Sequence, residues 1–123
     1  MGPAMTRYRG LTLRVLSRSR PAMGPGKAEL LDHIAATGSI SAAARAMGMS
    51  YRRAWKLVEA LNEDFTGSLV TTATGGKRGG GAIVTELGLD ILRRYRSMES
   101  RASGAISREL PDFERLFKRP PRG

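Results

Sequence analysis

The stretch TGSISAAARAMGMSYRRAWKLVEAL, residues 37–61, decides the fold of this chain. Apolar residues recur at helical spacing on both sides of Gly48, which predicts two helices joined by a tight turn. Ser39 or Ser41 is expected to cap the first helix, and Ser50 the second. A short helix followed so closely by a basic helix is typical of the helix-turn-helix motif.

The second helix is expected to run to about Phe65, with one apolar side and one basic side. Its apolar side comprises Ala54, Leu57, Val58 and Leu61. At about 100° per residue, Arg52, Lys56 and Glu59 project on the far side, and Arg53 lies toward one flank. The first turns of such a helix present side chains to base edges in the major groove, where an arginine fork matches guanine. The pattern predicts a DNA recognition helix.

Three further residues of this helix, Tyr51, Trp55 and Lys56, are candidates for contacts around the recognition face. Tyr51 lies in the first turn, where base contacts are made, and is kept among the DNA-binding candidates. Trp55 is interpreted as filling the edge of the core, with stacking on a base or sugar as the alternative. Lys56, one turn on from Arg52, is placed for a phosphate or a purine edge.

Composition and charge narrow the class of protein. The chain has 123 residues, 41% of them apolar, which fits one folded domain. A net charge of +10 favours a polyanionic partner, most commonly nucleic acid. No apolar run approaches the roughly 18 residues of a membrane span, and no signal peptide is visible. The lack of cysteine fits a reducing cytoplasm, which is the expected location.

Upstream of the motif, the sequence predicts a flexible basic arm over residues 1–10, a strand over residues 11–16 and a helix over residues 27–37. The alternating residues Leu11, Leu13 and Val15 would face inward from the strand. Residues 17–25 read as a polar connection. The helix carries Ala28, Leu31, Ile34 and Ala35 at helical spacing, and Gly38 suits its C-terminal cap.

Downstream, residues 68–72 and 82–85 are β-prone and flank the glycine-rich stretch TGGKRGGG. A β-hairpin directly after a helix-turn-helix is the wing of a winged helix. Lys77 and Arg78 at its tip would contact a neighbouring phosphate row or the minor groove. Ser39 and Ser41, at the start of the preceding short helix, would offer hydroxyl and N–H groups to phosphate.

Thr85 is expected to cap a long helix, with the helical region ending at Pro111. Its apolar residues follow heptad-like spacing, which favours a dimerisation seam: Leu87, Ile91, Tyr95, Met98, Ala102 and Ala105. An Asp90–Arg94 pair would support this helix. The predicted domain covers residues 11–110, and residues 111–123 form a basic tail rich in proline and arginine.

The segments TGSISAAARAMGMSYRRAW and ATGGKRGGGAIVTELG resemble the N-terminal winged-helix domain of ModE-type molybdate-responsive regulators. The helix-turn-helix is also similar to that of LysR-type regulators. The resemblance covers about residues 11–98 and implies a dimeric DNA-binding transcription regulator. The basic recognition helix and the heptad-like helix lead to the hypothesis of a homodimeric, sequence-specific regulator that binds a palindromic operator in double-stranded DNA. The resemblance puts Tyr51, Arg52 and Lys56 on the recognition helix and Lys77 in the wing. It also implies dimer contacts from the first strand and the long last helix.

Full-length members of that family continue into oxyanion-binding Mop-type domains, which nothing in this sequence resembles. Molybdate sensing is therefore not carried over: it is absent, or a separate effector-sensing protein supplies it. The fold class expected is mainly α, a winged helix-turn-helix with a small antiparallel hairpin, an N-terminal strand and a long C-terminal dimerisation helix. Two other functions stay open, a protein-interaction module whose basic face docks an acidic partner and an architectural DNA binder without sequence choice.

Catalytic residues, a metal site and a cofactor are not expected. One histidine and no cysteine leave only carboxylates for metal binding, and these are not clustered in the sequence. The glycine-rich stretch fails as a phosphate loop, because Thr71 stands where that motif requires glycine and Arg78 where it requires serine or threonine. An enzyme is therefore not the expected class.

Overall fold

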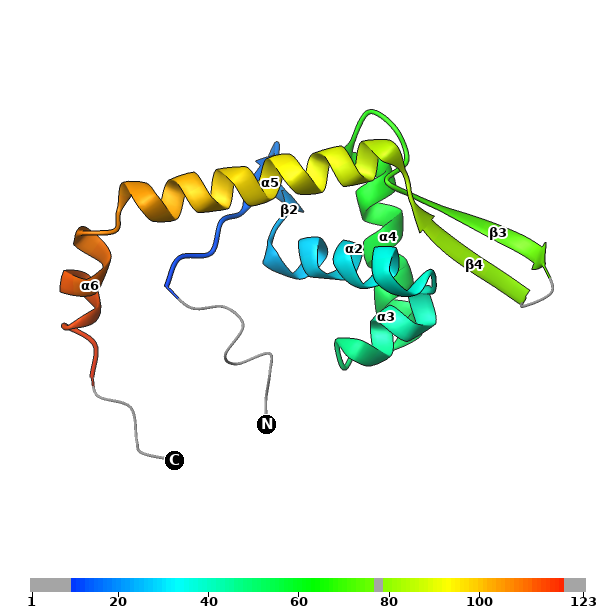
Figure 1. Cartoon of the computed structure of the whole chain (residues 1–123), viewed down its shortest axis with the longest axis horizontal. Helices are drawn as coiled ribbons and strands as arrows, with labels where there is room; N and C mark the ends of the chain where they lie inside the picture. The colour runs from blue at the N-terminus through cyan, green and yellow to red at the C-terminus, as the bar shows by residue number, and fades with distance from the viewer. Residues whose placement is uncertain (1–9, 77–78, 119–123) are drawn as a thin grey trace.

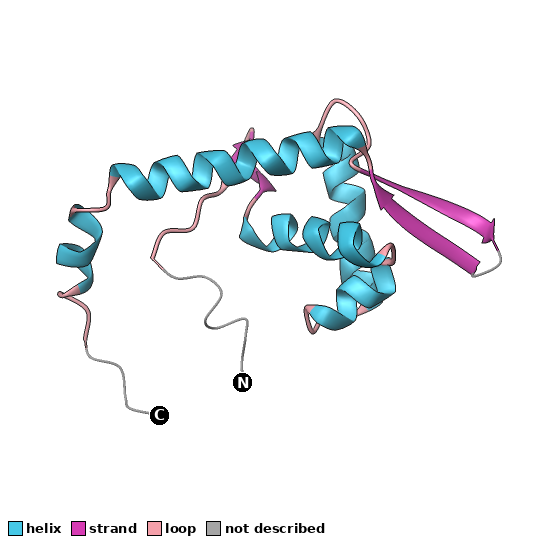
Figure 2. Cartoon of the chain, viewed as in Figure 1, coloured by secondary structure: helices cyan, strands magenta, loops and turns pink. Residues whose placement is uncertain are grey.

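The computed structural model describes residues 10–76 and 79–118, leaving aside the side chains of 74–80. It confirms a mainly helical winged helix-turn-helix (Figure 1). The helices are α2 (Pro25–Thr37), α3 (Ile40–Ala46), α4 (Tyr51–Asp64), α5 (Glu86–Ala105) and α6 (Glu109–Glu114). The strands form two antiparallel pairs, β1 (Val15–Ser17) with β2 (Arg20–Met23), and β3 (Val70–Gly76) with β4 (Gly79–Val84). Figure 2 shows the β3–β4 hairpin projecting from one end of α5, with α6 at the other end.

The helix ends follow the capping residues predicted from the sequence. Each N-cap hydroxyl accepts a hydrogen bond from a backbone N–H three positions on: Ser39 from Ala42 at 3.0 Å, Ser50 from Arg53 at 3.1 Å and Thr85 from Gly88 at 3.0 Å. Gly38 ends α2 with φ at 69°, a left-handed conformation in which glycine has no steric penalty. These local bonds set where the recognition helix α4 begins.

The core lies where α2, α3 and α4 meet beneath the start of α5. Its largest fully buried side chains are Leu30, Leu31, Ile34, Val58, Leu61, Leu69 and Tyr95. Each such side chain contributes about 1.5 to 3 kcal/mol by leaving water. Because they come from the helices and from the entry to β3, one core holds the helix-turn-helix, the hairpin and α5 together.

Asn62 connects the recognition helix to the hairpin. Its Oδ1 accepts hydrogen bonds from the N–H groups of Leu69 at 2.8 Å and Val70 at 3.0 Å, and its Nδ2 donates to the Val70 carbonyl at 3.0 Å. The N–H of Ala82 on β4 also donates to the Gly38 carbonyl at 2.9 Å. The root of the wing is therefore fixed to α4 and to the α2–α3 turn.

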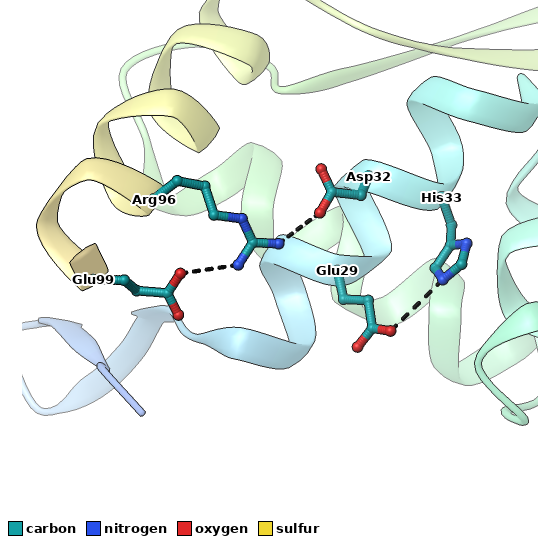
Figure 3. Close-up of polar contacts among 5 residues, drawn as sticks. All are labelled: Glu29, Asp32, His33, Arg96 and Glu99. Carbon is teal, nitrogen blue, oxygen red and sulfur yellow. Dashed lines mark hydrogen bonds and ion pairs between the residues drawn. The ribbon is translucent and has the colours of Figure 1, made fainter. Parts of the chain in front are cut away.

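Arg96 ties α5 to α2 (Figure 3). Its guanidinium donates to Asp32 at 2.5 Å and to Glu99 at 3.0 Å. Burial alone would lower the pKa of Arg96, but the hydrogen bonds to the two carboxylates outweigh it and the pKa is raised. On the neighbouring turn of α2, His33 lies 3.7 Å from the Glu29 carboxylate, a structural pairing.

The N-terminal strand differs from the prediction. The paired residues are 15–17 rather than 11–16, and the expected polar connection contains β2. In this pairing Leu16 lies opposite Pro21. Proline is tolerated in such a two-stranded sheet because its missing N–H can face away from the ladder. The predicted inward side was wrong at Leu11 and Val15, which are each 37% exposed, whereas Leu13 is half-buried against the core as predicted.

The predicted start of α2 and the predicted end of the helical region at Pro111 both require correction. Helix α2 begins at Pro25 rather than residue 27, because proline at the first helical position lacks only an N–H that has no partner there. On this helix Ala35 is exposed and Leu30 is buried instead. Pro111 does not end the helical region, because it lies in the first turn of α6, where proline is compatible with helix for the same reason.

Candidate nucleic-acid interface

The exposed side of α4 is cationic over its first turns, where Arg52 and Lys56 lie, and acidic further on at Glu59 and Glu63; its opposite side is buried. Arg52 and Lys56 are exposed, whereas Ala54, Val58 and Leu61 are buried. Leu57, also expected inside, is half-buried against the core. The predicted orientation of the helix is confirmed, and its guanidinium and ammonium groups face solvent.

The cations of the helix-turn-helix differ in ion pairing from three of the arginines on α5. Within the described chain, Arg45, Arg52, Arg53 and Lys56 form no ion pair, and no acid occurs between Asp32 and Glu59. By contrast, Arg93, Arg94 and Arg96 on α5 each pair with a carboxylate. The predicted Asp90–Arg94 pair is present at 2.9 Å. Positive charge without a paired carboxylate is therefore present along α3 and the first turns of α4.

A groove of about 400 Å³ lies between α3, the first turns of α4 and the hairpin. Its lining includes Ser39, Ser41, Tyr51, Trp55, Thr72 and Gly81, and we call it the wing-side groove. The Tyr51 and Trp55 rings stack within it at 6.3 Å between centroids and 16° between planes. Tyr51 is 52% exposed, so an aromatic face is available beside the cationic stripe.

The predicted DNA-binding residues fall into three groups. Ser41, Tyr51, Arg52, Arg53 and Lys56 are exposed around the start of α4 and α3. Ser39 and Ser50 are used first as N-caps, and Ser39 also lines the wing-side groove. Lys77 and Arg78 lie outside the described residues, so the structure places only the strands that lead to them.

The predicted dimerisation residues do not form one exposed seam. Leu87 and Ile91 are half-buried against the core, and Tyr95 is 1% exposed with its hydroxyl donating to the Leu13 carbonyl at 2.6 Å. Met98 is 44% exposed. Ala102, a turn further on, is half-buried.

A pocket of about 160 Å³ opens beside Met98, between α5 and the β1–β2 pair. Val15, Met23, Phe65, Ile91 and Tyr95 complete its lining, together with Arg94. Leu89 and Leu16, at 45% and 56% exposure, are further large apolar side chains in contact with solvent on α5 and β1.

Sequence reasoning overlooked two residues of the interface. Arg45 on α3 is an exposed, unpaired cation, and its place on the outer side of a short helix was the available signal. Thr72 reaches the wing-side groove through the β3–β4 pairing, which no local pattern shows. Trp55 packs against the core, as predicted, and also lines the groove; its stacking on a base or sugar stays a prediction.

No helix in residues 10–76 and 79–118 is long and apolar enough to cross a membrane. Within the same ranges, no three histidine or carboxylate side chains are grouped so as to hold a metal ion.

The hairpin, the tight turn and the cationic recognition helix together define a winged helix-turn-helix, a class of DNA-binding proteins. Residues 26–89 match the family of bacterial regulatory helix-turn-helix proteins of the lysR type, and the chain belongs to that family. This is a family of DNA-binding regulators rather than of enzymes.

Relatives among characterised proteins agree on the type of domain. The chain is 40% identical over 107 residues to the molybdenum-pterin-binding protein MopB of Rhodobacter capsulatus. It is 44% identical over 96 residues to the molybdenum transport protein ModE of Herbaspirillum seropedicae. It is also 44% identical over 71 residues to the DNA-binding transcriptional dual regulator ModE of Escherichia coli K12. These matches cover 87%, 73% and 58% of this chain but 38%, 36% and 27% of the relatives. The chain therefore carries a ModE-like helix-turn-helix domain and spans well under half the length of these proteins.

Proposed function

We propose that this protein is a sequence-specific DNA-binding transcription regulator of the ModE type, acting as a homodimer in the cytoplasm. The observation that carries the proposal is the unpaired cationic side of α4 next to the wing-side groove. A helix about 10 to 12 Å across fits the major groove, which is about 12 Å wide. Arg52 would read a base edge, while Lys56 and the serines of α3 would contact phosphates.

A homodimer is supported by the flank of α5 that carries Met98, next to the β1–β2 pair. Met98 and the apolar pocket beside it are open in the single chain, and apolar surface of this kind commonly marks an interface. A two-fold dimer through α5 would present two recognition helices to a palindrome, with half-sites about 34 Å apart. Tyr95 supports such an interface indirectly, because it holds α5 against the N-terminal segment.

A link to molybdate homeostasis is supported by relatives named as a molybdenum transport protein and a molybdenum-pterin-binding protein. The division of the chain into an arm over residues 1–10, a domain over 11–110 and a tail over 111–123 is part of the same proposal. Helix α6 spans the last of these boundaries.

The test is selection of binding sites from a random duplex library with the full chain, followed by footprinting on the selected sequence. A palindromic consensus with a defined protected segment supports the proposal. Recovery of unrelated sequences with a specificity ratio near one would instead support architectural binding without sequence choice.

A protein-interaction function is favoured by a different observation, the exposed apolar end of the described chain. Phe113, Leu116 and Phe117 are 60%, 82% and 61% exposed on and after α6. Apolar surface this concentrated is uncommon on a monomer without a binding role. If the selection recovers no DNA while a protein partner binds in a way that Leu116→Ser abolishes, the interaction function replaces the proposed one.

A further inference from the structure

A second cationic cavity lies on the flank of α4 away from the wing. It measures about 350 Å³, and Arg14, Lys27 and Arg53 contribute its positive charge, with Met49 and Leu57 in its lining. We call it the flank cavity. The three cations come from the segment before β1, from the first turn of α2 and from the first turn of α4. Sequence reasoning could not have grouped them, because only the fold brings these segments together.

The flank cavity and the wing-side groove lie on opposite sides of the recognition helix. Trp55 lines the groove and Arg53 lines the cavity, and two positions on a helix differ by about 200° around its axis. The stripe of Arg52 and Lys56 lies midway between them. A helix of this width seated in the major groove turns one flank toward each of the two bordering phosphate rows.

The charges of the flank cavity are not neutralised by the chain. Neither Arg14 nor Arg53 forms an ion pair with any of the acids, all of which the structure describes. The stem of Arg14 passes over Gly24, where an added Cβ would lie 3.5 Å from its Cγ. Lys27 donates to the Pro21 carbonyl at 2.9 Å. Burial lowers the pKa of this lysine, and the nearby Asp64 carboxylate only partly offsets it. An anion in the cavity would relieve the cost of this desolvated charge.

We propose that the flank cavity holds backbone phosphates of the DNA strand that borders the major groove on the side away from the wing. Arg14 and Lys27 are then DNA-positioning residues, and Arg53 contacts phosphate rather than a base edge. This inference rests on the proposed function and adds to it a second phosphate clamp. With a cationic contact on each flank, α4 would be held at a fixed depth and register in the groove.

The expected size of the effect follows from counterion release. Each phosphate contact lowers log K by about 0.9 per log unit of salt, which corresponds to about fivefold in affinity at 0.15 M salt. Loss of the contacts from Arg14 and Lys27 should weaken binding by about 30-fold and reduce the salt slope by about 2. The preference for the selected sequence over random DNA should stay unchanged, because phosphates carry no sequence information.

The experiment measures binding of the full chain to its selected duplex by fluorescence anisotropy at several salt concentrations. Arg14→Gln and the Arg14→Gln/Lys27→Gln double variant are compared with Arg108→Gln, which removes an exposed, unpaired charge outside the cavity. Glutamine keeps a side-chain donor for the Pro21 carbonyl. Should the double variant unfold, as circular dichroism would show, Arg14→Gln alone must still weaken binding by about fivefold.

Duplexes with single methylphosphonates identify which phosphates are involved. Neutralising phosphates on the strand away from the wing should weaken the wild-type chain but not the double variant. If wild type binds its selected site and the double variant matches Arg108→Gln in affinity and salt slope, the inference is overturned while the proposed function stands. A wild-type chain that prefers no sequence contradicts the proposed function and the inference together.

Discussion

Replacing Gly88 by alanine should destabilise the protein although alanine favours helix. An ideal Cβ at this position would lie 2.5 Å from the Leu69 carbonyl oxygen and 2.7 Å from Cγ1 of Val84. That oxygen is held by the Thr85 N–H at 2.9 Å, so it cannot move away freely. The higher helix propensity of alanine relative to glycine stabilises the folded state by about 0.8 to 1 kcal/mol, while overpacking destabilises it by about 1 to 3 kcal/mol or more. Because the contact is with backbone, we expect a net loss of about 1 to 2 kcal/mol.

Gly104→Ala is the matched control, because it makes the same change in the same helix. No atom lies within 4 Å of an ideal Cβ there, so only the gain in helix preference remains, about 0.5 to 1 kcal/mol. Urea unfolding followed by circular dichroism, at one fixed protein concentration, gives both free energies. The two variants should shift in opposite directions. Equal stabilisation by both would refute the close packing of α5 against the entry to β3.

Two further substitutions test the attachment of the wing and the dimer. Asn62→Ala should lower the free energy of unfolding by at least about 1 to 3 kcal/mol, because it leaves backbone groups of buried Leu69 and Val70 without their hydrogen-bond partner. A midpoint of urea unfolding within error of wild type would contradict this expectation. Met98→Glu should weaken the homodimer at least about tenfold, since burial of a methionine side chain contributes about 1.5 to 3 kcal/mol. Analytical ultracentrifugation measures it against Ser100→Glu, which adds the same charge about 200° around α5; equal dimerisation of the two variants would place the interface elsewhere.

Features set by a few neighbouring residues could be predicted from the sequence. The hydroxyls of the N-caps Ser39, Ser50 and Thr85 each accept a hydrogen bond from a residue three positions on. Gly38 caps α2 through its own left-handed backbone conformation. The two sides of α4 follow from helical periodicity alone. Together with the hairpin, these features were enough to predict the winged helix-turn-helix.

Features that depend on distant partners could not be predicted in this way. Strand β2 contains Pro21, and proline in a local sequence pattern indicates a break in a strand. Only the pairing of residues 20–23 with β1 makes this segment a strand. Heptad-like spacing cannot show whether a side chain faces its own core or a partner. Tyr95 faces its own core, where it bonds a carbonyl 82 positions away. Most of the candidate DNA-binding residues could be predicted because they share one helix, whereas the flank cavity joins three segments.

The central claim, that the cationic side of α4 reads bases in duplex DNA, is tested most directly by the binding of Arg52→Ala to the selected duplex and to random duplex. The account predicts a loss of about 1 to 3 kcal/mol on the selected sequence and a much smaller loss on random DNA. Equal losses on the two duplexes would contradict base readout by α4, and no loss on either would show that this side of the helix does not enter the groove.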